Sequence, residues 1–386
     1  MEDTARAVFE LGLLLVLAAG AGWLARRVGL PAVVGYLAVG LAVSPFTPGY
    51  VADRRQIEVL ADVGVVLLLF EVGVELDPLR LRRERGRLFL LVPIQVIVGA
   101  GLAAAAAVFT GLSTGGAAVL GLSVALSSSV VVVNITRSRR RTTDPATDAL
   151  LLGWSVLQDL VGVGIAMLLL MALGTFRGSP AQAVAGFVAY VLVAALSAWL
   201  TPWALRRLRS EHDLFLLLSV AIGLVLAGLG ARVFGVPLAL AAFVAGLAIS
   251  EGPDMAEARR RLLPFRDLFA VMFFVAIGTL IDPSAVVRSL PWIALLVALV
   301  LVTKTGLIYS LARLGRLPGR PFQLAVGLSQ VGEFGFVLGS IALSAGLLTA
   351  DVYTALLATV ALTIALSAVI VRAFRRPGSG GDVAPI

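Results

Sequence analysis

The stretch GLPAVVGYLAVGLAVS at residues 29–44 recurs in the second half of the chain as GVPLALAAFVAGLAIS at residues 235–250, with Gly, Pro, Gly, Leu, Ala and Ser in register. A second match follows at nearly the same offset, because FEVGVELDP at 70–78 aligns with VAIGTLIDP at 275–283. Apolar helices also resemble one another by chance, which is the alternative interpretation of either match alone. Two matches at one offset favour an internal repeat.

The composition of the 386-residue chain is typical of a membrane protein. Hydrophobic residues make up 59% of it and charged residues 14%, and the mean hydropathy is +1.00, whereas a soluble domain carries about 25% charged residues. Apolar runs long enough to cross roughly 30 Å of hydrocarbon recur throughout. We predict an all-α transmembrane domain over residues 1–372 with about 13 spans, and a short cytoplasmic tail at 373–386. The predicted spans lie near 8–25, 31–46, 57–76, 88–109, 114–135, 149–172, 180–205, 213–231, 237–250, 263–282, 291–312, 321–346 and 350–372.

Arginine clusters orient these spans. If the spans alternate in direction, Arg80–Arg87, Arg137–Arg141, Arg206–Arg209 and Arg259–Arg261 fall on one side, which the positive-inside rule makes cytoplasmic. We therefore expect the N-terminus outside and the C-terminus in the cytoplasm. The net charge of +8 then reflects topology and not nucleic-acid binding. The second and ninth spans run in opposite directions, so the repeat is an inverted-topology repeat.

Each copy of the repeat holds one stretch that is poorly suited to a continuous helix. LSSSVVVV at 126–133 is rich in hydroxyl and β-branched residues, and GLSQVGEFG at 327–335 contains three glycines. Two discontinuous helices that cross near the membrane midplane are expected there, with freed carbonyls and half-helix dipoles available to an ion. Close packing through small residues is the alternative interpretation. The residues expected at these breaks are Ser127, Ser128 and Ser129 in the first copy and Ser329, Gln330 and Gly332 in the second.

Four ionisable residues lie inside predicted spans, where a charge costs about 2.5–3.5 kcal/mol. Asp159 is expected near the midplane and is the candidate ion- and proton-binding carboxylate. Because burial disfavours a bare carboxylate, it can hold a proton or a cation, but not both. The other residues expected to bind the ion with Asp159 are Gln158, Ser127, Ser128 and Ser129. Lys304, the only lysine, is expected to pair with Asp159 or with Glu333, and a purely structural ion pair is the alternative. The other interpretation of Glu333 is a second titrating group. Glu71 is expected to line a cytoplasmic funnel.

Several function classes have no support in the sequence. Cysteine is absent and histidine occurs once, which excludes thiol chemistry and a His/Cys zinc site. No spacing of a nucleophile and a base indicates an enzyme. No cofactor is expected beyond the transported ion and proton.

These landmarks resemble the monovalent cation:proton antiporter-2 family, and most closely the membrane domain of the Kef-type potassium/proton antiporters. The likeness covers nearly the whole chain and is carried by GLPAVVGYLAVG, LADVGVVLLLFEVGVELD, LSSSVVVV, LQDLVGV, LPFRDLFAVMFFVAIGTLID, KTGLIYSLARL and GLSQVGEFGFVLGS. The resemblance implies the sodium/proton antiporter fold, an elevator-type mobile core domain, a dimerisation domain and a homodimer in the bacterial inner membrane. It gives Asp159 the role of the ion- and proton-binding carboxylate.

Within this family, two adjacent aspartates are typical of electrogenic sodium exchangers, whereas the pair Gln158–Asp159 resembles the electroneutral potassium branch. Potassium is therefore favoured, and sodium is the alternative. Glu71 stands where the family has an apolar residue, and Ser129 where it has a threonine. Kef-type proteins continue into a nucleotide-binding regulatory domain, and we do not extend their regulation to this chain unless a separate cytoplasmic subunit supplies it.

The sequence leaves two other functions open. One is a passive cation conductance, which would need a continuous polar pathway. The other is a carrier or sensor for an organic anion on a related inverted-repeat scaffold, which would need several cationic groups at mid-membrane. Polar residues cluster at two breaks and one aspartate, so a single occluded site for a cation is favoured.

Overall fold

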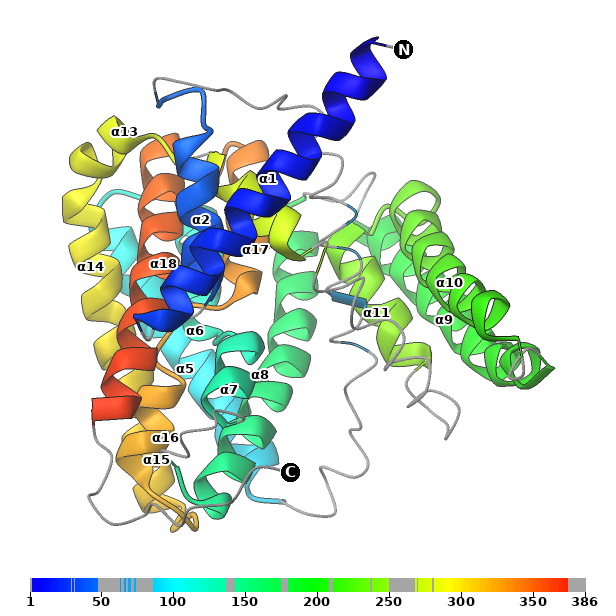
Figure 1. Cartoon of the computed structure of the whole chain (residues 1–386). Coiled ribbons are helices and arrows are strands. Elements are labelled where there is room, and N and C mark those ends of the chain that lie inside the picture. The colour runs from blue at the N-terminus through cyan, green and yellow to red at the C-terminus, as the bar shows by residue number, and fades with distance from the viewer. Residues whose placement is uncertain are drawn as a thin grey trace, which may run out of the picture. The chain divides into compact units, whose positions relative to one another are not determined.

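The computed structural model describes the chain in segments separated by short gaps. The described residues are 2–28, 30, 32–47, 63, 66, 69–70, 73, 86–136, 143–174, 180–207, 211–236, 238–249, 268, 270–279 and 281–373. Regular structure among them is helical throughout (Figure 1). Most of the predicted third span and part of the tenth lie outside the described residues, as does the predicted tail after Ala373.

The chain divides into two compact units. Unit 1 comprises Met1–Gly20, Tyr36–Arg83 and Met167–Leu280, and unit 2 comprises Ala21–Gly35, Glu84–Ala166 and Ile281–Ile386. The helices that lie wholly or partly in unit 1 are α1 (Glu2–Arg27), α2 (Ala32–Ala42), α9 (Pro180–Arg207), α10 (His212–Arg232) and α11 (Leu238–Ile249). The remaining helices, all in unit 2 except for the last turns of α8, are α5 (Leu88–Phe109), α6 (Thr114–Ala125), α7 (Ser129–Thr136), α8 (Pro145–Ala172), α13 (Pro283–Arg288), α14 (Leu290–Val300), η1 (Leu301–Gly306), α15 (Leu307–Leu314), α16 (Pro321–Gly327), α17 (Glu333–Ser344) and α18 (Ala350–Ala373).

Glycines from the repeated stretches interlock in unit 1. Gly40 packs against the backbone of Gly278, where a Cβ at Gly40 would lie 2.7 Å from the Gly278 Cα atom. Gly73 packs against the backbone at Gly246, whose carbonyl carbon would lie 2.9 Å from a Cβ at Gly73. Gly40 aligns with Gly246 in the sequence repeat, and Gly73 aligns with Gly278. Each contact therefore becomes the other when the two copies of the repeat are exchanged, as expected for two copies related by a two-fold axis.

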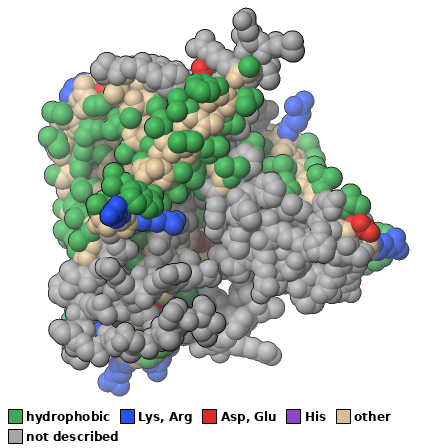
Figure 2. Space-filling view, viewed as in Figure 1, with side chains coloured by type: hydrophobic (Ala, Val, Ile, Leu, Met, Phe, Trp, Pro, Cys, Tyr) green, Lys and Arg blue, Asp and Glu red, His purple; other side chains and the backbone are tan. Residues whose placement is uncertain are grey.

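Several helices are long and apolar enough to cross a membrane, and the chain is a multi-pass membrane protein. The candidate spans among the described residues are Val8–Arg27, Leu88–Phe109, Pro145–Ala172, Val184–Thr201, Leu290–Leu314 and Ala350–Ser367. Along α1 the surface is mostly apolar, and basic side chains gather at its C-terminal end, where Arg26 and Arg27 lie (Figure 2). An apolar helix with a basic end is the pattern that the positive-inside rule describes.

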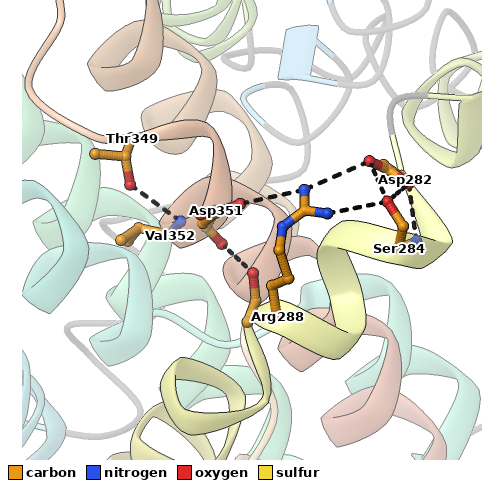
Figure 3. Close-up of polar contacts among 7 residues, drawn as sticks. Asp282, Ser284, Arg288, Thr349, Asp351 and Val352 are labelled. Atoms are coloured by element: carbon orange, nitrogen blue, oxygen red, sulfur yellow. Dashed lines mark hydrogen bonds and ion pairs between the residues drawn. The ribbon is translucent and has the colours of Figure 1, made fainter.

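Unit 2 is a tightly packed bundle. Helix α5 packs along α6, and α14 packs along α18 (Figure 1). Gly121 of α6 allows the close approach to α5, because a Cβ there would lie 2.8 Å from the Ala104 backbone nitrogen. At the start of α18, Arg288 of α13 lies 3.8 Å from a carboxylate oxygen of both Asp282 and Asp351 (Figure 3). Close backbone contact thus packs the bundle around the two interrupted helices, and the exposed ion pairs add little to its stability.

Both interruptions occur within the stretches that the sequence indicated. Helix α6 ends at Ala125 and α7 begins at Ser129, so residues 126–128 are non-helical. Helix α16 ends at Gly327 and α17 begins at Glu333, which leaves 328–332 outside the helices. The breaks expose backbone groups that a continuous helix would pair internally.

Candidate functional site

The two breaks are joined to each other through their backbones. The Gly332 amide donates to the Leu126 carbonyl at 3.0 Å, and the Ser127 hydroxyl donates to the Leu328 carbonyl at 2.7 Å. The Gln330 side-chain amide donates to the Ser128 carbonyl at 3.3 Å. Each break therefore supplies partners for groups that the other leaves unpaired, which a buried backbone requires.

Glycine at position 332 is needed for this contact. A Cβ there would lie 2.6 Å from the carbonyl carbon of Ser127 and 2.9 Å from the Ser128 amide nitrogen. These atoms are backbone and cannot move aside as a flexible side chain would. Gly332 thus sets how closely the two interrupted helices approach.

Lys304 reaches both breaks from a third helix. Its side chain is 0% exposed, and its Nζ atom donates to the carbonyl oxygens of Leu126 at 2.7 Å and of Gln330 at 2.5 Å. Leu126 lies in the first break and Gln330 in the second. One ammonium group therefore joins a backbone carbonyl of each break.

The helix that carries Lys304 changes its winding at this point. Residues Leu301–Gly306 form the π-helical turn η1 between α14 and α15. Such single turns re-aim side chains and are frequent at functional sites. The neighbouring Thr305 shares a hydroxyl–hydroxyl hydrogen bond of 2.6 Å with Ser329 of the second break. Side chains from two successive positions of η1 thus contact the break region.

Asp159 lies on α8 beside the first break and is 1% exposed. Its carboxylate attracts the Lys304 ammonium electrostatically. Three residues further along α8, a Cβ at Gly162 would lie 2.5 Å from the Leu126 side chain. The acid and the lysine therefore share the region where the breaks cross. Asp159 is one of the two partners that the sequence suggested for Lys304.

Gln158 holds the backbone of the first break. Its Oε1 atom accepts from the Ser127 amide at 3.3 Å, and its Nε2 atom donates to the Ala125 carbonyl at 3.3 Å and to Gln95 Oε1. The second break has an equivalent arrangement, in which the Val331 amide donates to the Thr363 hydroxyl of α18 at 3.1 Å. A side chain from a neighbouring helix thus pairs with a freed amide in each copy.

The other predicted residues are placed as follows. Ser127, Ser128 and Gln330 are buried in the breaks, and Ser129 is partly buried at the first position of α7. Helix α17 begins at Glu333, whose side chain lies outside what the structure describes. Glu71 also lies outside the described residues.

Gln95 was missed by the sequence analysis. It is fully buried in α5, and its one signal is that it is the only polar residue in the run LFLLVPIQVIVGAG. A lone glutamine in an apolar span is polar enough to need partners, but the sequence does not say where they lie. The structure places them on α6 and α8.

Two interrupted helices from inverted repeats, with a buried acid and a buried lysine where they cross, define the class of inverted-repeat secondary transporters. Residues 13–374 match the transmembrane sodium/hydrogen exchanger family, and the chain belongs to that family.

Similar proteins agree with this assignment. The putative cation/proton antiporter YbaL of Escherichia coli (strain K12) is 31% identical over 376 residues, which cover 92% of this chain and 66% of that relative. The chain thus spans just under two thirds of the relative's length. Two structures of the sodium proton antiporter MjNhaP1 from Methanocaldococcus jannaschii share the fold, with TM-scores of 0.72 and 0.70 at 16% and 15% identity. They cover 96% of this chain, and 98% and 96% of their own.

Proposed function

We propose that the chain is an antiporter that exchanges a monovalent cation for protons across a bacterial inner membrane. The observation that carries this proposal is the position of Asp159, buried beside two helix breaks and balanced by the Lys304 ammonium. A bare carboxylate in such a place is costly. A proton and an alkali cation are then alternative neutralising partners for one group, and this competition couples their movements.

Lys304 competes with the transported cation in this proposal. Its ammonium attracts Asp159 and donates to the carbonyls of Leu126 and Gln330. When a cation occupies the site, these carbonyl oxygens and the Asp159 carboxylate become its ligands, since alkali and other hard cations prefer oxygen, and Lys304 gives up its two hydrogen bonds. When Asp159 is protonated instead, Lys304 keeps its backbone partners and holds the two breaks together.

The finer assignments extend the proposal. Gln158, a neutral residue next to Asp159, leaves one carboxylate to exchange one cation for one proton, which supports electroneutral exchange. Potassium is the preferred cation and sodium the alternative, on the resemblance to the Kef-type branch. Elevator-type alternating access, a homodimer, an outside N-terminus and a cytoplasmic C-terminus belong to the same proposal.

The test uses everted membrane vesicles with an imposed pH gradient. Addition of potassium, sodium or rubidium chloride is expected to dissipate the gradient in vesicles with the wild-type chain, most strongly with potassium, and Asp159→Asn is expected to abolish the response. Asp148→Asn is the matched control, because Asp148 is the acidic residue in the first turn of the same helix. Normal exchange by Asp159→Asn would overturn the site assignment. Cation flux without proton counterflow would indicate a passive conductance instead.

A further inference from the structure

Gln95 forms the far end of a buried chain of hydrogen bonds that leads to the first break. Its Oε1 atom accepts from Gln158 Nε2 and from the Trp154 indole nitrogen, the latter at 3.4 Å. Its Nε2 atom donates to the Ala125 carbonyl at 3.3 Å. All of these groups are buried in unit 2.

The orientations of the Gln95 and Gln158 amides in this chain of hydrogen bonds are fixed at both ends. The Trp154 indole nitrogen can only donate, so the oxygen of the Gln95 amide faces it. The Ser127 amide can also only donate, so the oxygen of the Gln158 amide faces the break. Gln158 then presents its nitrogen to the Gln95 oxygen, and both side-chain nitrogens share the Ala125 carbonyl. A reversed Gln95 amide would set nitrogen against nitrogen at both Trp154 and Gln158.

We propose that Gln95 is a positioning residue for ion exchange, which fixes the orientation of the Gln158 amide and thereby the backbone of the first break beside Asp159. This inference rests on the function proposed above. Gln95 touches no transported ion in this scheme and acts only through Gln158. Its neutral amide supplies two acceptor contacts and one donor contact without adding a charge near the Asp159–Lys304 pair.

Loss of Gln95 should therefore weaken the site without removing any group that carries charge. In Gln95→Met, a side chain of similar length leaves the Gln158 and Trp154 donors without their acceptor, and the Gln158 amide can turn. The Ser127 amide then loses a fixed partner. Leaving a buried polar group unpaired lowers the equilibrium constant for the ordered state by about tenfold or more. The apparent KM for the cation should therefore rise about tenfold, while the maximal rate falls much less.

The experiment measures exchange against cation concentration in everted vesicles for wild type, Gln95→Met, Gln158→Met and the double variant. If Gln95 acts only through Gln158, the double variant should have the same KM as Gln158→Met alone. Ser123→Ala is the matched control, because the buried Ser123 hydroxyl donates only to the Val119 carbonyl of its own helix at 2.8 Å. A Gln95→Met protein with wild-type KM, or additive effects in the double variant, would overturn the proposal.

Hydrogen exchange separates this inference from the proposed function. In the full-length purified protein, the amide of Ser127 should exchange faster in Gln95→Met than in wild type, and Ser123→Ala should leave it unchanged. This readout does not depend on transport. If wild-type vesicles respond to none of the cations, the proposed function is wrong. The hydrogen-exchange result still shows whether Gln95 fixes the Gln158 amide and the backbone at Ser127. Unchanged protection at Ser127 would refute that role.

Discussion

The Nζ atom of Lys304 donates a hydrogen bond to the Leu126 carbonyl oxygen at 2.7 Å, just beyond the C-terminal end of α6. The C-terminus of a helix carries partial negative charge, so an ammonium group is stabilised there. The same group donates to the Gln330 carbonyl of the second break. Lys304 therefore joins the two copies of the repeat at the level of the backbone, in addition to balancing Asp159.

Replacement of Lys304 tests this double role. Lys304→Met should lower the free energy of unfolding by about 3 kcal/mol or more, because it leaves Asp159 without its buried countercharge and two carbonyls without a donor. Thermal unfolding of the detergent-solubilised protein measures the loss. Arg313→Met, which removes an exposed cation two turns further along the same helical run, should cost less than about 0.5 kcal/mol.

The double variant Lys304→Met/Asp159→Asn should recover part of the stability lost in Lys304→Met, since no uncompensated buried charge is left. The carbonyls of Leu126 and Gln330 stay unpaired, so recovery should be incomplete. Asp159→Asn alone completes the cycle, and a double variant whose loss of stability equals the sum of the two single losses would show that Asp159 and Lys304 are not energetically coupled.

The sequence could predict the helices because their apolar runs are long. The predicted span 88–109 coincides with α5, and the two predicted breaks contain the non-helical residues 126–128 and 328–332. The glycines of the repeated stretches could be aligned from the letters alone. Their crosswise packing, Gly40 with Gly278 and Gly73 with Gly246, fits two copies related by a two-fold axis.

The contacts inside the site could not be predicted in the same way. The groups that accept hydrogen bonds from Lys304 are backbone carbonyls. Every residue has one, so the residue type does not indicate which carbonyls are involved. The π-helical turn around Lys304 leaves no pattern in an apolar run. Gln158 was predicted to bind the ion, and its amide contacts the Ser127 backbone and Gln95 in this structure. The role of Gln95 depends on partners on other helices, which a single sequence does not connect.

The glycine contacts of unit 1 predict that alanine at Gly40 or at Gly73 destabilises the protein. Gly40→Ala and Gly73→Ala should each destabilise the protein by about 1–3 kcal/mol, because the new Cβ atoms would meet backbone at Gly278 and Leu247 at 2.7 and 2.6 Å. Gly228→Ala is the control, since nothing lies within 4 Å of a Cβ there. Thermal unfolding of the three variants measures the difference. Equal stability of Gly40→Ala and Gly228→Ala would refute the interlocked repeat.

Because of Asp144, just before α8, the stability of the folded protein should depend on pH in the acidic range. Partial burial raises its pKa, but hydrogen bonds from the Thr147 side chain and backbone and the charge of Arg320 at 3.4 Å outweigh this, so its pKa lies below the ordinary value of 3.8. Because the folded-state pKa is lowered, the stabilisation is fully present above pH 3.8 and is lost as the pH falls through the folded-state value.

Asp144→Asn should therefore be less stable than wild type at pH 6 by about 0.5–1 kcal/mol, and the two proteins should converge as the pH is lowered below 3.8. Unfolding temperatures measured from pH 6 to pH 3 give the comparison. A deficit that does not shrink as the pH falls would mean that the stabilisation does not come from the ionised form of Asp144.

Gly332→Ala separates the geometry of the breaks from the stability of the bundle. A Cβ at this position would lie 2.5 Å from the Ser127 carbonyl oxygen and 2.6 Å from its carbon, so the second break must move away from the first. The hydrogen bond from the Gly332 amide to Leu126 would lengthen, and the Leu126 carbonyl is also a Lys304 partner.

Displacement of these groups disturbs the site directly, whereas the helices on either side keep their packing. Exchange by Gly332→Ala in everted vesicles should therefore fall by more than about tenfold, with a loss of stability of about 1–3 kcal/mol. Gly101→Ala on α5, where nothing lies within 4 Å of a Cβ, should leave exchange intact. Wild-type exchange by Gly332→Ala would show that close backbone contact between the breaks is dispensable, because the added methyl group has no space unless they separate.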